Sequence, residues 1–127
     1  MNDKLLIRLK FGASAWNDWR ASNPDHPIDL EGAPLNGMIL TGINFAGASL
    51  RGASLHATNL MNADLRAADL TDADLREADL IGARLEGAML HGADLREADL
   101  LGARLEGAKC STADLLGAIH APGWFRA

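Results

Sequence analysis

The chain has 127 residues, 48% of them apolar, and a formal net charge of −5. This length fits one small domain with its own hydrophobic core rather than two domains. The mild acidity argues against direct binding of nucleic acid, because phosphate groups are held by clustered Lys and Arg, and it favours a basic or neutral protein partner.

The first predicted element is a helical cap within residues 1–27. Over residues 3–21 the apolar side chains fall roughly on one face of a helix, or of two short helices broken near Gly12. The helical pattern ends before Asn23 and Pro24. The residues on that face are Leu5, Leu9, Trp16 and Trp19.

Residues 28–119 carry an uninterrupted five-residue repeat. Sixteen of the eighteen positions taken every fifth residue from Leu30 to Leu115 are Leu, and the other two are Phe45 and Cys110. Two residues before each of them stands a second small or apolar residue, which is Ala in fourteen of the eighteen units. A five-residue step fits neither an α-helix, where these leucines would spiral around the axis, nor a flat strand, where they would alternate between faces. A corner must therefore follow each inward pair.

The corners and their number can also be predicted. Glycines such as Gly82 and Gly87 follow many of the leucines and would turn the chain. The segment TDADLREADL at 71–80 nearly recurs as HGADLREADL at 91–100. This twenty-residue period predicts four sides, so eighteen units make about 4.5 coils. We therefore expect an all-β solenoid, a quadrilateral β-helix with Leu ladders inside and a short N-terminal helical cap.

The run ADLREADLIGARLEGA at 73–88 resembles the A(D/N)LXX signature of the pentapeptide-repeat family, and the resemblance covers about 90 residues. It implies a right-handed quadrilateral β-helix. The opening segment SAWNDWRASNP resembles an N-terminal motif that precedes the repeats in some bacterial members. The residues that carry this second resemblance are Trp16, Trp19, Arg20, Asn23 and Pro24.

The outward side chains differ from one side of the coil to another. Asp74, Asp94 and Asp114 stand beside Arg76 and Arg96 on the side containing Leu75, and the opposite side carries Arg84 and Arg104 beside Glu86 and Glu106. We interpret these ladders as solvated ion pairs, with an acidic docking face as the alternative.

The third side differs, because Met61, Ile81 and Leu101 fall on equivalent outward positions of successive coils. We call these three residues the apolar stripe. Ile39 and Ile119 flank it, and Asn59, Asp79 and Asp99 lie among its members. An apolar row of this length on a monomer predicts a contact with a partner or a second copy, the alternative being harmless scatter.

The last segment, residues 120–127, follows the decay of the repeat at Ile119 and His120. Its aromatic residues Trp124 and Phe125 would either cover the last coil or join two subunits in a homodimer.

The sequence contains no phosphate loop, no CxxC and no HExxH, and its four histidines are scattered. We therefore expect no catalytic, cofactor or metal site and no small-molecule substrate, and an enzyme is a remote alternative. The main hypothesis is a structural or protein-interaction module. The resemblance also suggests a gyrase-binding protein that mimics DNA, since residues 28–119 hold fourteen acidic and seven basic side chains.

The single cysteine, Cys110, excludes an intramolecular disulfide and indicates a reducing compartment. Charges interrupt the apolar residues of the opening MNDKLLIRLKF, and no run reaches transmembrane length. We therefore expect a cytoplasmic protein without a membrane segment.

Overall fold

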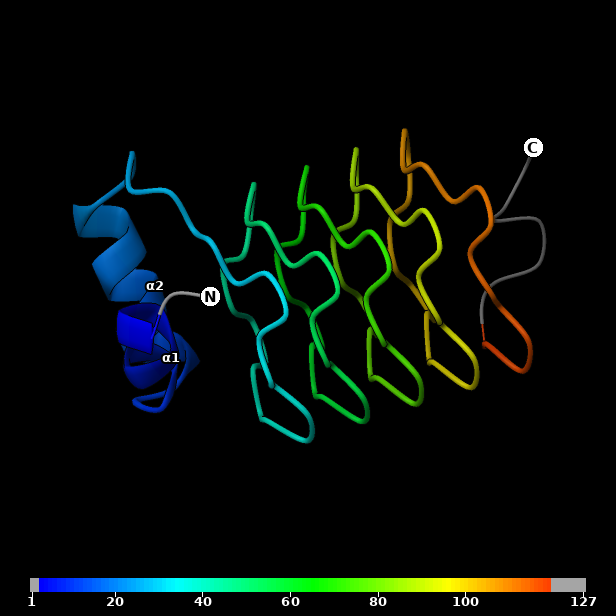
Figure 1. The fold of residues 1–127 in the computed structure, drawn as a ribbon, viewed down its shortest axis with the longest axis horizontal. Helices are drawn as coiled ribbons and strands as arrows, with labels where there is room; N and C mark the ends of the chain where they lie inside the picture. The colour runs from blue at the N-terminus through cyan, green and yellow to red at the C-terminus, as the bar shows by residue number, and fades with distance from the viewer. Residues whose placement is uncertain (1–2, 120–127) are drawn as a thin grey trace.

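A computed structural model describes residues 3–119. Two helices lie at the N-terminal end, and a row of stacked coils follows them (Figure 1). Helix α1 spans Asp3–Leu9 and helix α2 spans Ala13–Ser22. Gly12 separates them with a φ of 95°, a conformation that residues with a Cβ rarely adopt. Of the two predicted alternatives, one helix or two short helices broken near Gly12, the structure shows the second.

The coils are held together by isolated parallel β-bridges between residues twenty apart, such as Ser54 with Asp74 and Asp74 with Asp94. Each five-residue unit contributes a single bridging residue, so no extended strand forms within residues 3–119. The predicted twenty-residue period is confirmed, and the figure of 4.5 coils stays a prediction.

Four sides follow from this register, and we number them in chain order by their bridging residues. The first side contains Asp29, Ser49, Asp69, Met89 and Lys109, and the second contains Pro34, Ser54, Asp74, Asp94 and Asp114. The third side contains Ile39, Asn59, Asp79, Asp99 and Ile119, and the fourth contains Asn44, Asp64, Arg84 and Arg104.

Every corner between two sides needs a left-handed residue. The second residue after each inward Leu, Phe45 or Cys110 has a positive φ, between 57° and 75°, in all eighteen units. Eleven of these residues are Gly, as the sequence predicts, and seven are not. Thr112, with a φ of 62°, is the most strained of the seven, because a β-branched side chain strongly disfavours this conformation.

The interior is filled by the inward Leu and Ala residues, which are buried from Ala33 to Leu100. Beyond Leu100 the inward side chains are only partly buried, because within residues 3–119 no further coil lies on them. Cys110 is among them and is only partly buried. Burial is still sufficient to raise the pKa of its thiol.

Helix α2 covers the open edge of the first coil on the fourth side. In the later coils the bridging residue donates its N–H to the preceding coil, as Asp64 does to the carbonyl of Ile43 at 2.9 Å. Asn44 has no such coil before it, and its N–H is accepted by Oδ1 of Asn17 at 2.7 Å. Arg20 donates to the carbonyls of Asn44 and Ala46, both at 3.0 Å. Side chains of α2 thus replace the main-chain bonds of an absent coil.

On the second side, Pro34 stands at the same kind of open edge, where a backbone N–H would have no preceding coil as its partner. It occupies the first bridging position of that side, where the corresponding residue one coil later, Ser54, donates its N–H to the carbonyl of Ala33 at 2.9 Å. A proline has no N–H, so at an edge with no preceding coil nothing is left unpaired.

Candidate protein-contact surface

The structure places Met61, Ile81 and Leu101 one above another on the third side, as predicted. The N–H of Asn62 donates to the carbonyl of Ile81 at 2.9 Å, and that of Gly82 donates to the carbonyl of Leu101 at 3.0 Å. These main-chain bonds place one member of the apolar stripe on each of three successive coils.

A polar residue orients each member of the apolar stripe. Oδ1 of Asn59 accepts the N–H of Met61 at 3.0 Å, and the carboxylates of Asp79 and Asp99 do the same for Ile81 and Leu101 at 3.1 Å. Such turns, in which an Asx side chain accepts a backbone N–H two residues later, hold the apolar side chain at a defined corner.

The third side also exposes apolar surface at its two ends. Ile39 is 76% exposed, Ile119 is 54% exposed and Leu101 is 52% exposed, whereas Met61 and Ile81 are partly buried. The contact itself stays a prediction. Trp124 and Phe125, the other predicted contact residues, lie outside the described residues.

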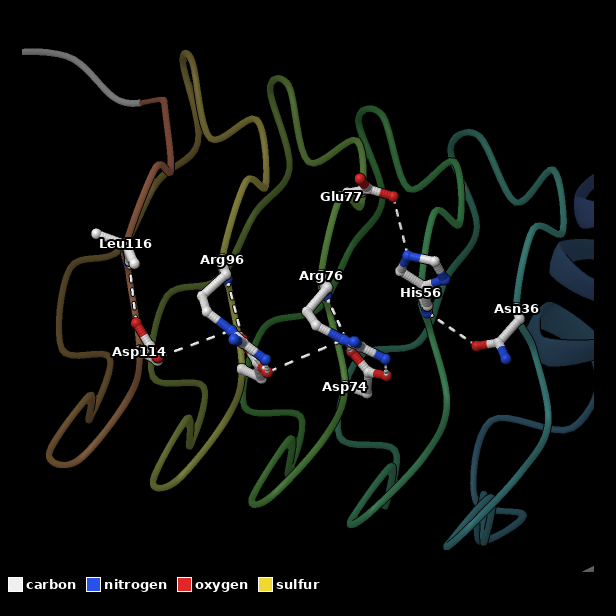
Figure 2. A network of polar contacts seen from close by, with 9 residues as sticks. Asn36, His56, Asp74, Arg76, Glu77, Arg96, Asp114 and Leu116 are labelled. Atoms are coloured by element: carbon white, nitrogen blue, oxygen red, sulfur yellow. Dashed lines mark hydrogen bonds and ion pairs between the residues drawn. The ribbon is translucent and has the colours of Figure 1, made fainter.

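The second side carries the ion-paired ladder that the sequence predicts, shown in Figure 2. The guanidinium of Arg76 holds Asp74 through two hydrogen bonds of 2.8 and 2.7 Å, and it reaches Asp94 of the next coil at 3.9 Å. Arg96 repeats the arrangement, with contacts to Asp94 at 2.7 Å and to Asp114 at 3.8 Å. The Asp and Arg charges of this ladder therefore alternate along the rod.

These bonds shift the titration of the carboxylates. Side-chain hydrogen bonds from Arg76 and Arg96 lower the pKa values of Asp74 and Asp94, outweighing the opposite effect of burial. On the fourth side a hydrogen bond from Arg66 likewise lowers the pKa of Asp64. Charge-assisted bonds of this kind favour the ionised carboxylate.

The fourth side matches its prediction only partly. Arg84 and Glu86 form an ion pair at 3.3 Å, and Asp64 pairs with Arg66 at 2.7 Å. Within residues 3–119 no ion pair joins Arg104 to Glu106, the last of the predicted pairs, although these two charges lie on the same coil.

A small open pocket of about 190 Å³ lies on the corner after the second side, and the sequence pattern did not indicate it. Nε2 of His56 contacts a carboxylate oxygen of Glu77 at 2.9 Å across two successive coils (Figure 2). Their spacing of twenty-one residues places them on neighbouring corners of successive coils, but it does not specify that the two side chains point toward each other. The lining residues are His56, Arg76, Glu77, Arg96 and Glu97.

The pocket offers little for chemistry, because its arginines are engaged by Asp74 and Asp94 and its walls face solvent. Among residues 3–119 no group of three His, Cys, Asp or Glu side chains could hold a metal ion. In the same part of the chain no helix is long and apolar enough to cross a membrane.

Comparison with known proteins identifies the repeat. A family model described as pentapeptide repeats matches eight copies over residues 28–66 and 68–107. The pentapeptide repeat protein Rfr23 from the cyanobacterium Cyanothece 51142 is 33% identical, with a TM-score of 0.71 over 72% of this chain and 63% of Rfr23. HetL from Nostoc sp. strain PCC 7120, a pentapeptide repeat protein involved in heterocyst differentiation regulation, is 40% identical with a TM-score of 0.69, over 77% of this chain and 47% of HetL.

A more distant structure shares the fold alone. Trypsin-treated QnrB1, a plasmid-mediated fluoroquinolone resistance protein, is 24% identical with a TM-score of 0.51, over 71% of this chain and 59% of QnrB1. No curated protein matches the chain. The family match begins at residue 28, so the resemblance of the opening segment SAWNDWRASNP to a bacterial N-terminal motif stays a prediction. The chain belongs to the pentapeptide repeat family, whose members form right-handed quadrilateral β-helices.

Proposed function

We propose that this protein is a non-catalytic interaction module and that the third side is its contact surface. The observation that carries the proposal is the apolar stripe, whose three members are fixed on successive coils by main-chain bonds. Exposed apolar rows are uncommon on monomers and are typical of surfaces that bind another protein.

The shape of the third side supports this role. The corner that carries the apolar stripe is already held by main-chain and Asx-turn hydrogen bonds. It needs little rearrangement to bind, so most of the gain from removing apolar surface from water, about 25 cal/mol per Å², is retained. The exposed side chains of Ile39 and Ile119 extend the apolar surface to both ends of the side. A docked partner would therefore meet exposed apolar side chains at both ends of the side, with Asn59, Asp79 and Asp99 between them.

The titratable groups support a role without catalysis. The carboxylates of Asp74 and Asp94 are held by arginines in the ionised form, and neither stands in an enclosed site where its pKa would be raised for acid catalysis. Pentapeptide repeats here serve as a scaffold that presents side chains at regular spacing.

Mimicry of DNA is the second candidate, and one observation favours it: residues 28–119 carry fourteen acidic against seven basic side chains, a net charge of −7. The ion pairs of Asp64, Asp74 and Asp94 weigh against it, because a duplex presents unbroken negative charge. A gyrase supercoiling assay with a fluoroquinolone tests this candidate. Failure of the protein to protect gyrase would rule out DNA mimicry.

The main proposal is tested by replacing Ile81 and Leu101 together with Ser and comparing the proteins retained from native cell lysate by quantitative mass spectrometry. At least one protein held by the wild type should be lost from this variant. Leu116→Ser is the matched control, because Leu116 is a 73% exposed apolar residue on the second side. If the two variants and the wild type retain the same proteins, and light scattering shows all three as monomers, the third side is no contact surface.

A further inference from the structure

The third side differs from the other three because it carries acidic but no basic side chains. Its residues 38–42, 58–62, 78–82, 98–102 and 118–119 include Asp79 and Asp99 but no Lys or Arg. Each other side carries at least two basic residues. They are Arg51 and Lys109 on the first side, Arg76 and Arg96 on the second, and Arg66, Arg84 and Arg104 on the fourth.

The two carboxylates of the third side also differ in their partners. Asp74 and Asp94 on the second side are each bound by an arginine at 2.7 Å. Asp79 and Asp99 each accept one backbone N–H, from Ile81 and Leu101, and within residues 3–119 neither takes part in an ion pair. Both aspartates are partly exposed beside the apolar stripe, with no basic partner among residues 3–119.

We infer that the third side binds a protein segment in which apolar side chains are flanked by Lys or Arg, rather than a second copy of this chain. This inference rests on the proposed function and names the chemistry of the partner. Apolar side chains of that segment would cover Ile81 and Leu101. Its basic side chains would meet Asp79 and Asp99, which lie two residues before them on the same coils.

The charges argue against a second copy. A symmetric dimer through this side would bury the same surface on both molecules, which would bring Asp79 and Asp99 of each copy into one interface. With no Lys or Arg on the third side, these carboxylates would lose water without gaining a partner, and burying an unpaired charge is costly. A basic segment instead turns the same carboxylates into attractive contacts and speeds association.

The chain itself shows how to remove these charges without disturbing the fold. Asn59 occupies the equivalent position one coil earlier and accepts the N–H of Met61 at 3.0 Å, as Asp79 and Asp99 do for the residues two ahead of them. Replacement of both aspartates by Asn therefore keeps the turns. Glu31→Gln with Glu106→Gln is the matched control, because it removes the same net charge from the first and fourth sides.

The experiment measures binding of three short labelled peptides by fluorescence anisotropy: one of alternating Leu and Lys, one of alternating Ser and Lys, and one of alternating Leu and Glu. Wild-type protein should bind the Leu–Lys peptide most tightly. The Asp79→Asn, Asp99→Asn protein should bind it about tenfold more weakly, with a flatter dependence on salt. The Glu31→Gln, Glu106→Gln protein should match the wild type.

Equal weakening in the two charge variants would show that the peptide responds only to net charge, and the inference would be wrong. Tight binding of the Leu–Glu peptide, or a wild-type dimer that Ile81→Ser with Leu101→Ser dissolves, would overturn it while leaving the third side as a contact surface. If the serine variant binds the Leu–Lys peptide as well as the wild type does, the proposed function fails too.

Discussion

The coil stack and the helical cap are stabilised in different ways. In the stack, the same inward Leu is repeated in unit after unit, and each is surrounded by leucines and alanines of the neighbouring coils. In the cap, a few side chains that occur once attach the helices to the first coil. Nε1 of Trp16 donates to the carbonyl of Asn44 at 2.8 Å, and its ring packs edge-on against Phe45 with centroids 5.5 Å apart.

The two kinds of stabilisation respond differently to a substitution. A repeated interaction can be weakened at one coil while its copies hold the neighbouring coils together. The contacts of Trp16, Asn17 and Arg20 have no copies, and they satisfy the main-chain groups at the fourth-side edge of the first coil. Single substitutions in the cap should therefore open that end, whereas most outward substitutions in the stack should have small effects.

The largest effect is expected when a charge is placed inside the stack. Leu75→Asp puts a carboxyl group where the side chain is fully buried and removes the packing of the leucine. The combined cost is comparable to the whole stability of a small domain. We expect no cooperative thermal transition, measured by circular dichroism. The outward neighbour Arg76→Ala should melt close to the wild type, and equal behaviour of the two would contradict the five-residue register.

Trp16→Ala should have the next largest effect, a loss of about 3 to 5 kcal/mol in the free energy of unfolding, because it leaves a cavity against Phe45 and removes a hydrogen bond. Trp16→Phe keeps an aromatic ring but not the Nε1 donor, so a loss of about 1 to 2 kcal/mol is expected. Urea denaturation measures both. A cap that contributes little to the first coil would show no difference between Trp16→Ala and wild type.

Repetition also determines how much of the fold could be predicted from the sequence. Leu75 and its equivalents share one environment, so their spacing was sufficient to predict the sides, the corners and the stacking of the apolar stripe. The bonds of Trp16, Asn17 and Arg20 to the first coil occur once and join residues 24 to 28 positions apart, with no period to reveal them. The contact of His56 with Glu77 depends on side-chain direction at a corner, which the repeat pattern does not specify.

A smaller effect of opposite sign is expected at the C-terminal end of the stack. Thr112 has a φ of 62°, which a β-branched residue strongly disfavours, so Thr112→Gly should raise the free energy of unfolding by about 1 kcal/mol. Gly107→Thr is the reverse control, because Gly107 has a φ of 75° and room for a Cβ. It should lower the stability. Changes of the same sign in the two variants would show that packing, and not backbone strain, determines the outcome.

The smallest expected effect is a loss of stability at low pH. Hydrogen bonds from Arg66, Arg76 and Arg96 hold the pKa values of Asp64, Asp74 and Asp94 below the ordinary value of 3.8 in the folded state. The unfolded chain therefore binds protons first as the pH falls, and these carboxylates stabilise the fold fully only above their unfolded pKa.

We expect the free energy of unfolding to decrease as the pH falls below about 4 and through the folded pKa values, with each exposed pair contributing at most about 1 kcal/mol. Urea denaturation at a series of pH values measures this decrease. Asp74→Asn with Asp94→Asn should flatten it, since Asn does not titrate. A second-side variant that is as acid-sensitive as the wild type would show that its ion pairs do not stabilise the folded state.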